Sequence, residues 1–182
     1  VYYQILDGNG NGQLAADGIS ACSGDWEIIQ PRVKAENAVA YIVWEDRRNG
    51  WTSDIYAQKV NTDGSTGWLG NGRGITTSDG RQTEPRLTTD GNGGVYFVWE
   101  DQRNSDVSGI DIYAQHVLSD GSLDWPLEGY ALTNQTGLQS SPNICSDGQN
   151  GAYVIWKDNA ASSYGDIVAT HLSSTGVIAP GQ

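Results

Sequence analysis

The chain has 182 residues and a formal net charge of −12, from 22 acidic and 10 basic side chains. This excess of acid argues against a nucleic-acid partner, because binding phosphates needs a basic face. No apolar run reaches the ~20 residues that a membrane-spanning helix needs. The 24 glycines, 7 tryptophans and 9 tyrosines, against one phenylalanine and no methionine, are typical of short strands joined by tight turns.

Residues 1–18 look like the second half of a unit that recurs later in the chain. Residues 1–6 align with residues 55–60, and Gly10 and Gly18 align with Gly64 and Gly74. The front half of this unit would precede position 1. We therefore expect the chain to be part of a larger protein.

The same stretch contains a candidate calcium loop. Asp7, Asn9, Asn11 and Gly12 match the start of the Asp-x-Asn-x-Asn-Gly pattern. However, Gly18 stands where such a loop needs a bidentate Glu, and the flanking segments are expected to be strands rather than helices. An ordinary turn is the favoured interpretation, with calcium at Asp7, Asn9 and Asn11 as the alternative. No other cofactor is predicted.

The first complete unit spans residues 19–73. Pro31 opens a predicted strand, and residues 38–44 form a run of seven strongly β-forming residues. A polar loop follows, and then residues 54–60 alternate with period 2, as a third strand should. A short fourth strand is predicted to begin at Trp68 and Leu69.

Two further units, residues 74–130 and 131–182, repeat this order. The tryptophans at 44, 99 and 156 are 55 and 57 residues apart, and each unit has a Pro ahead of its central strand. Four short strands per unit of about 55 residues indicate a blade of a β-propeller. A β-sandwich would not explain a tandem repeat of this length. The predicted fold is therefore all-β, with about three and a half blades of a larger propeller.

The repeated motifs are Val-Trp-Glu-Asp-x-Arg, Asp-Ile-Tyr-Ala-Gln and Asp-Gly-x-Gly-Gly. Together they resemble the repeats of secreted bacterial β-propeller proteins. The resemblance covers nearly the whole chain and implies an extracellular or cell-surface location. It implies little about activity, because that family is defined by its scaffold. The third unit departs from the pattern, since Ala160 replaces the Arg and Val168 replaces the Tyr.

The residues that recur in the units are predicted to be structural. A catalytic carboxylate pair is needed once, whereas an Arg near two Asp residues occurs in two units and partly in the third. Such an Arg can tie a loop to its blade by bidentate hydrogen bonds, and the tryptophans are expected to pack between blades. The residues are Trp44, Asp46, Arg48, Asp54, Trp99, Asp101, Arg103, Asp111, Trp156, Asp158 and Asp166.

Aromatic residues that break the repeat are the candidate ligand-binding residues. Trp51 and Tyr164 lie in variable loops, and Trp26 and Tyr130 also lack an aromatic equivalent in every unit. Exposed aromatics at such places can stack on sugar rings or anchor a protein partner. His116 and His171 have no catalytic or zinc-ligand spacing around them. Whether Cys22 and Cys145 form a bridge is left open.

The sequence predicts a non-catalytic, extracellular propeller segment that acts as a structural or protein- or glycan-binding module. A glycan-active enzyme, with most catalytic residues in blades beyond this chain, is the first alternative. A subunit of a self-assembling surface structure is the second. Because blades bury their faces against neighbours, the expected partners also include further blades of the parent chain or a second copy.

Overall fold

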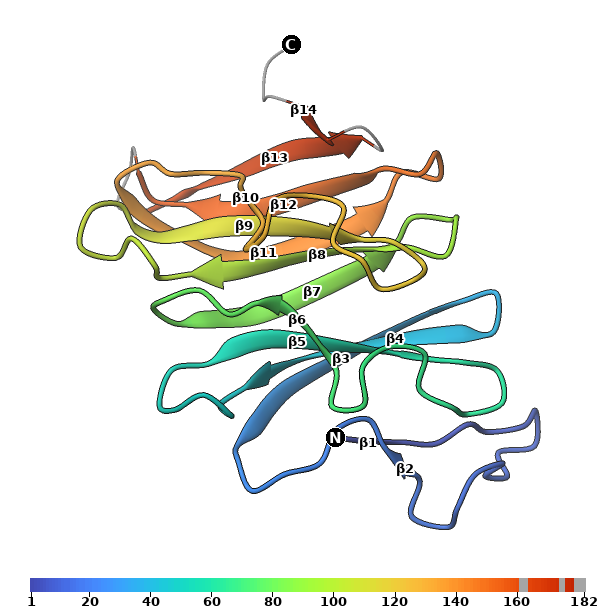
Figure 1. Ribbon diagram of the computed structural model, residues 1–182. Helices are drawn as coiled ribbons and strands as arrows, with labels where there is room; N and C mark the ends of the chain where they lie inside the picture. The colour runs from blue at the N-terminus through green and yellow to red at the C-terminus, as the bar shows by residue number, and fades with distance from the viewer. Residues whose placement is uncertain (161–163, 174–175, 179–182) are drawn as a thin grey trace.

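The computed structural model describes residues 1–160, 164–173 and 176–178, and these residues are all-β (Figure 1). They form a half-blade followed by two four-stranded blades and a third blade that has three long strands and one short one. The half-blade pairs β1 (Tyr2–Tyr3) with β2 (Ile19–Ser20). The first blade contains β3 (Ile28–Glu36), β4 (Val39–Asp46), β5 (Asp54–Val60) and β6 (Arg73–Thr76). No helix long and apolar enough to span a membrane occurs in the described segments.

The second and third blades repeat the same antiparallel order. The second contains β7 (Gln82–Thr89), β8 (Val95–Asp101), β9 (Gly109–Val117) and β10 (Tyr130–Ala131). The third contains β11 (Gly137–Ser146), β12 (Ala152–Asp158) and β13 (Asp166–Ser173). The short β14 (Gly176–Ile178) pairs with the end of β13, where the first two blades have only the isolated bridges of Val60 with Thr66 and of Val117 with Leu123. A two-residue parallel pairing between the starts of β9 and β11 joins these two blades into one eight-stranded sheet.

The blades stack face to face, and each interface is a hydrophobic core. Trp44 packs between the half-blade and the first blade, and Trp99 lies in the cluster between the first and second blades. Trp156 lies in the cluster between the second and third. Successive side chains of a strand point to opposite faces of its blade, so the apolar residues of one strand contribute to the cores on both sides.

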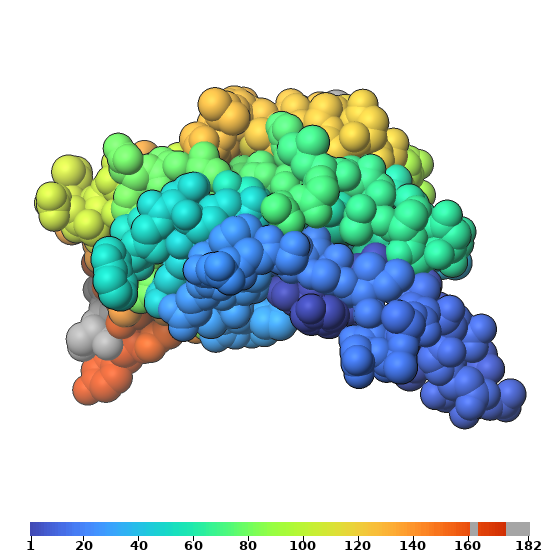
Figure 2. All heavy atoms as spheres, turned by 60° about the horizontal axis from the view of Figure 1, so that its bottom comes forward, coloured from blue at the N-terminus to red at the C-terminus, as the bar shows by residue number. Residues whose placement is uncertain are grey.

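The first strands of neighbouring blades, β3, β7 and β11, lie against one another. This is the place where blades converge on a propeller axis. The stack is curved, with the N-terminal residues at one end of an arch and the third blade at the other (Figure 2). The described sheets form an open arc rather than a closed ring.

Tyrosine hydroxyls of the central strands donate hydrogen bonds to the next blade. The Tyr41 hydroxyl donates to the Gly93 carbonyl at 2.6 Å, and the Tyr96 hydroxyl donates to the Asn150 carbonyl at 2.8 Å. In both cases a tyrosine of a central strand reaches the hairpin turn of the next blade. Each interface between blades is therefore a hydrophobic core with hydrogen bonds between the blades at its edge.

Each first strand has a bulge near its start. The backbone of Gln30, Glu84 and Ser141 has positive φ, between 52° and 57°, and the pairing register shifts at these residues. A proline follows each of them, and the bulge turns the preceding polar residue out of the ladder. The strand in the first blade thus begins at Ile28, three residues before the predicted opening at Pro31.

The fourth strands differ from the prediction. Trp68 and Leu69 lie in a turn region, and β6 forms only at Arg73–Thr76. Likewise, Ile19–Ser20 pairs with the half-blade rather than opening the first blade. The sheets thus divide the chain a few residues later than the predicted boundaries at 18/19, 73/74 and 130/131. Cys22 and Cys145 are both free thiols, the first buried and the second exposed.

Candidate functional site

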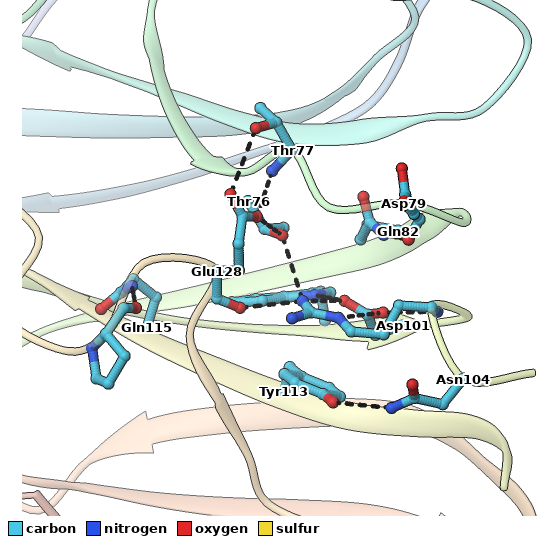
Figure 3. A network of polar contacts seen from close by, with 12 residues as sticks. Thr76, Thr77, Asp79, Gln82, Asp101, Asn104, Tyr113, Gln115 and Glu128 are labelled. Carbon is cyan, nitrogen blue, oxygen red and sulfur yellow. Dashed lines mark hydrogen bonds and ion pairs between the residues drawn. The ribbon is translucent and has the colours of Figure 1, made fainter. Parts of the chain in front are cut away.

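A polar tie holds the loop after the central strand in the second blade (Figure 3). Arg103 Nε and Nη2 donate to the two oxygens of Asp101 at 2.9 and 2.7 Å. The Trp99 indole also donates to Asp101, at 2.8 Å, and the guanidinium carbon lies 4.0 Å from the centre of the Tyr113 ring. Asp101 is fully buried, so these charge-assisted bonds replace its lost hydration.

The first blade contains the same tie. Arg48 binds Asp46 at 2.9 and 2.7 Å, Trp44 donates to Asp46 at 2.8 Å, and the guanidinium lies over Tyr56. Burial raises the pKa of Asp46, but the hydrogen bonds from Arg48 and Trp44 outweigh it and leave the pKa lowered. In both blades the Arg also reaches a backbone carbonyl beside the fourth strand, that of Asn71 in the first.

The second carboxylate of each blade stands apart from the Arg. Asp54 accepts a hydrogen bond from Asn49 at 2.7 Å, and Asp111 accepts one from Ser108 at 2.6 Å. Burial is the main cause that raises the pKa of both. The predicted arrangement, with an Arg between two carboxylates, is thus replaced by one bidentate pair and one carboxylate with neutral donors. The two parallel donors of the guanidinium bind a single carboxylate, and a further contact of each Arg goes to a backbone carbonyl rather than to the second Asp.

The third blade has the same backbone but different side chains. Trp156 is buried, and Asp158 faces Asp166 across the strand pair, as Asp101 faces Asp111. The backbone N–H of Ala160 donates to Asp158 at 2.7 Å, which repeats the bond from the backbone of Arg103 to Asp101. The Arg side chain itself is missing.

A second polar arrangement lies on the first strands, where the blades converge. Arg32 donates to Gln30 at 2.8 Å, Gln30 donates to Glu84 at 3.1 Å, and Arg86 pairs with Glu84 at 3.0 Å. These four residues, which we call the inner row, run across the first two blades. The side chains of Arg86 and Glu84 are 27% and 34% exposed, so the row is open to a ligand.

Two further glutamates lie behind the inner row. Glu45 accepts the backbone N–H of Glu84 at 2.9 Å, and Glu100 accepts that of Ser141 at 2.8 Å. Each therefore binds the bulge of the next blade. Lys157 occupies the corresponding place in the third blade. The bulge residues cannot take their ladder bond, and these carboxylates supply the missing acceptor.

The electrostatics of the three glutamates are coupled. Burial raises the pKa of Glu45, although the N–H of Glu84 partly offsets this. Burial also raises the pKa of Glu100, and the nearby charges of Glu84 and Glu45 act in the same direction. One oxygen of Glu45 is buried without a hydrogen-bond partner among the described residues. Buried Glu45 and partly exposed Glu100, both with raised pKa, thus stand beside Glu84, which is about one-third exposed.

The four candidate aromatics lie in different environments. Trp51 and Tyr164 are 95% and 91% exposed, on corresponding loops of the first and third blades. Trp26 packs near the guanidinium of Arg48, and Tyr130 contacts Trp125 edge-on. The second blade separates the loops of Trp51 and Tyr164, so the structure does not gather the four residues into one surface.

The candidate calcium loop is a compact turn. Asp7 Oδ1 accepts the backbone N–H groups of Asn9 and Asn11 at 2.8 and 2.9 Å, and Asp7 Oδ2 accepts the Asn11 amide at 3.0 Å. These bonds, led by that of the Asn11 side chain, lower the pKa of Asp7. The described residues contain no cluster of three or more His, Cys, Asp or Glu side chains suited to a metal.

Both histidines bind turn carboxylates. His116 lies between Asp90 and Asp124, at 3.0 and 2.9 Å, and stacks on Tyr96. His171 contacts Asp147 at 2.7 Å. Because the pairing of a histidine with the hairpin Asp recurs in two blades, it fastens a turn to its blade.

Sequence reasoning missed the inner row and the glutamates behind it. Glu45 and Glu100 were visible as the Glu of each Trp-Glu-Asp motif, but their partners lie about 40 residues ahead. The available signal was Pro31 and Pro85 themselves, because a proline within a sheet is confined to edge strands, strand starts and bulges.

No family model matches the chain, and no curated protein matches it. Among solved structures it is similar to an endo-arabinase from Bacteroides thetaiotaomicron, with 16% identity and a TM-score of 0.52. An alpha-L-arabinanase from Penicillium chrysogenum, complexed with arabinobiose, also has 16% identity, with a TM-score of 0.46. The matches cover 84% and 85% of this chain but 56% and 48% of those proteins, so the chain spans about half their length. The chain has the fold of part of a β-propeller.

Proposed function

We propose that the chain is a segment of a glycan-active β-propeller and that the inner row binds carbohydrate. The observation that carries the proposal is the coupling of this open row to buried Glu45 and partly exposed Glu100 behind it. The glycan-active alternative thereby replaces the non-catalytic module as the preferred function. An extracellular location accords with the proposal, because polysaccharides are encountered there.

The composition of the inner row suits a sugar. Arg, Gln and Glu side chains are planar, and each can bind two neighbouring hydroxyl groups at once. The bulges hold Gln30 and Glu84 away from the strand ladder, and the bonds from Arg32 and Arg86 fix their orientation. A site of this kind is organised before the ligand arrives, which lowers the entropy cost of binding.

The coupled glutamates supply the chemistry that glycoside hydrolysis needs. Such reactions use one carboxylic acid that donates a proton and one carboxylate that acts as base or nucleophile. Glu100 has a raised pKa and is partly accessible, while Glu84 is half-exposed and paired with Arg86. We assign Glu84 to the carboxylate role and Glu100 to the acid. Residues of further blades would complete the site across the axis.

The test is a binding and hydrolysis assay with the whole protein. Arabinan is the first polysaccharide to use, because the similar solved structures are named for it, with xylan and galactan beside it. Retardation in a polysaccharide-containing gel measures binding, and the release of reducing ends measures hydrolysis. Glu84→Gln keeps the shape of the side chain and removes its charge. Asp106→Asn, in the exposed loop of the second blade, is the matched control for loss of one charge.

Three results are distinguished. Binding and hydrolysis that both fall in Glu84→Gln, and persist in Asp106→Asn, support the proposal. Binding that depends on Glu84 without any release of reducing ends would retain the inner row as a glycan site but reject the enzyme. Absence of retardation on all three polysaccharides would refute the carbohydrate assignment.

A non-catalytic role has one observation in its favour. Glu45 and Glu100 each accept a backbone N–H of the next blade, which is a structural task performed twice. If Glu100→Gln lowers stability and leaves product release unchanged, Glu100 is a fastener between blades rather than an acid.

A further inference from the structure

The third blade contains a cavity where the first two blades hold an arginine. Its volume is about 390 Å³, and its lining includes Thr133, Trp156, Asp158, Ala160, Asp166 and Val168. The corresponding residues around Arg103 are Thr76, at the end of β6 in the first blade, and Trp99, Asp101, Asp111 and Tyr113 in the second. The two residues that differ in size are the Arg, reduced to Ala160, and the Tyr beneath it, reduced to Val168. Both changes enlarge the space in front of Asp158.

The two carboxylates of the site are retained, whereas the carbonyl of Glu128, which Arg103 also contacts, has no counterpart among the residues that the structure describes. Asp158 and Asp166 still face each other across the strand pair, and the backbone of Ala160 holds Asp158 as the backbone of Arg103 holds Asp101. The position of the carboxylate is therefore kept although its cation is gone.

Trp156 provides independent evidence of an incomplete site. Trp44 and Trp99 each donate their indole N–H to the carboxylate that binds the Arg, at 2.8 Å. Trp156 is 3% exposed, and its indole N–H is buried with no hydrogen-bond partner in the described part of the chain. A buried donor without a partner is unfavourable, and native proteins rarely leave one.

We propose that this cavity binds a guanidinium group supplied by another molecule. The group would donate two parallel hydrogen bonds to Asp158, as Arg103 does to Asp101. It would also fix the carboxylate in the orientation that accepts the indole N–H of Trp156. Binding thus completes the tie that the other two blades build internally. A guanidinium fits better than an ammonium, because only the planar fork contacts both oxygens of one carboxylate.

The experiment follows the indole N–H resonances of the whole protein during titration with methylguanidinium. The Trp156 resonance should shift saturably, whereas those of Trp44 and Trp99 should stay in place because their sites are filled. Methylammonium should produce a weaker response at equal concentration. A second titration with an arginine capped at both ends compares a peptide-borne guanidinium with a free one. The probe that saturates Trp156 at lower concentration identifies the class of natural ligand.

Three variants test the site. Asp158→Asn should abolish the shift, and Ala160→Arg should abolish it as well by filling the cavity from within. Because Asp158→Asn could fail to fold, Ala160→Arg provides a variant that should raise the melting temperature. Arg103→Ala creates the same cavity in the second blade, so methylguanidinium should restore part of its lost melting temperature and shift the Trp99 resonance.

The proposal would be overturned if Trp156 did not respond while Trp99 of Arg103→Ala did. It would also be overturned if Ala160→Arg still showed the wild-type shift, because the probe would then bind elsewhere.

Discussion

Replacing Arg103 by Ala should be among the most destabilising single changes in the second blade. The side chain of Arg103 is 16% exposed and that of Asp101 is fully buried. Removal of one partner of a buried ion pair costs about 3–5 kcal/mol, because a charge is left without compensation. Here the indole of Trp99 and one backbone N–H still bind Asp101. We therefore expect the lower part of that range, about 3 kcal/mol, with loss of the contact to Tyr113 included.

The assay is urea unfolding followed by tryptophan fluorescence, with the change in midpoint read at constant slope. Arg86→Ala is the matched control. It removes the same side chain from a half-exposed ion pair with Glu84, and such pairs contribute about 0–1 kcal/mol. If the two variants lose equal stability, or Arg103→Ala loses less than about 1 kcal/mol, the pairing of Arg103 with buried Asp101 does not stabilise the blade more than an exposed ion pair would.

Three other predictions concern the blades. Burial, with the charges of neighbouring aspartates, raises the pKa of Tyr96 from 10.0 to about 12. A phenol whose pKa is raised on folding stabilises the protein fully below pH 10, and this contribution is lost as the pH rises towards 12. The pKa of Tyr41 is also raised to about 12, so alkaline titration of the tyrosinate absorbance should show a late component that Tyr96→Phe reduces but does not abolish. Gly129→Ala should cost about 1–3 kcal/mol in urea unfolding, because φ is +81° and a Cβ would lie 2.5 Å from a backbone oxygen. Gly148→Ala, with φ +76° and open space, should cost less, and equal losses would refute the steric argument. A thiol reagent should label exposed Cys145 at once and buried Cys22 only on unfolding; equal rates would contradict the packing of the half-blade.

The fold could be predicted because the residues that recur in each unit are those that form its strands and turns. The tryptophans end central strands, and the Asp-Gly turns set the hairpins, so spacing alone places three strands of each blade. The fourth strand was misplaced because Trp68 looks β-forming, yet it serves as a contact of the core between the first and second blades while β6 forms five residues later.

The inner row could not be predicted from the sequence. Positive φ at Gln30 and Glu84 is unusual for such residues and is maintained by contacts from the neighbouring blade, such as that of Glu45 to the N–H of Glu84. Interactions between units leave no periodic signal distinct from the repeat itself. The missing Arg at Ala160, by contrast, was visible in the sequence, but only the structure shows that its space stays open.

The hydrogen bonds between blades also determine how copies of this chain could associate. Tyr41 and Tyr96 each donate forward to the next blade, and Glu45 and Glu100 each accept a backbone N–H from it. Because the two faces of this joint carry different groups, the joint is heterologous and cannot be reproduced about a two-fold axis. If two copies met through this joint, they would be arranged head to tail and would close a ring or grow a filament, but would not form a symmetric face-to-face dimer. The third blade has Lys157 where the first two have Glu45 and Glu100. Its outer face therefore lacks the carboxylate that accepts a backbone N–H of the next blade at the other joints.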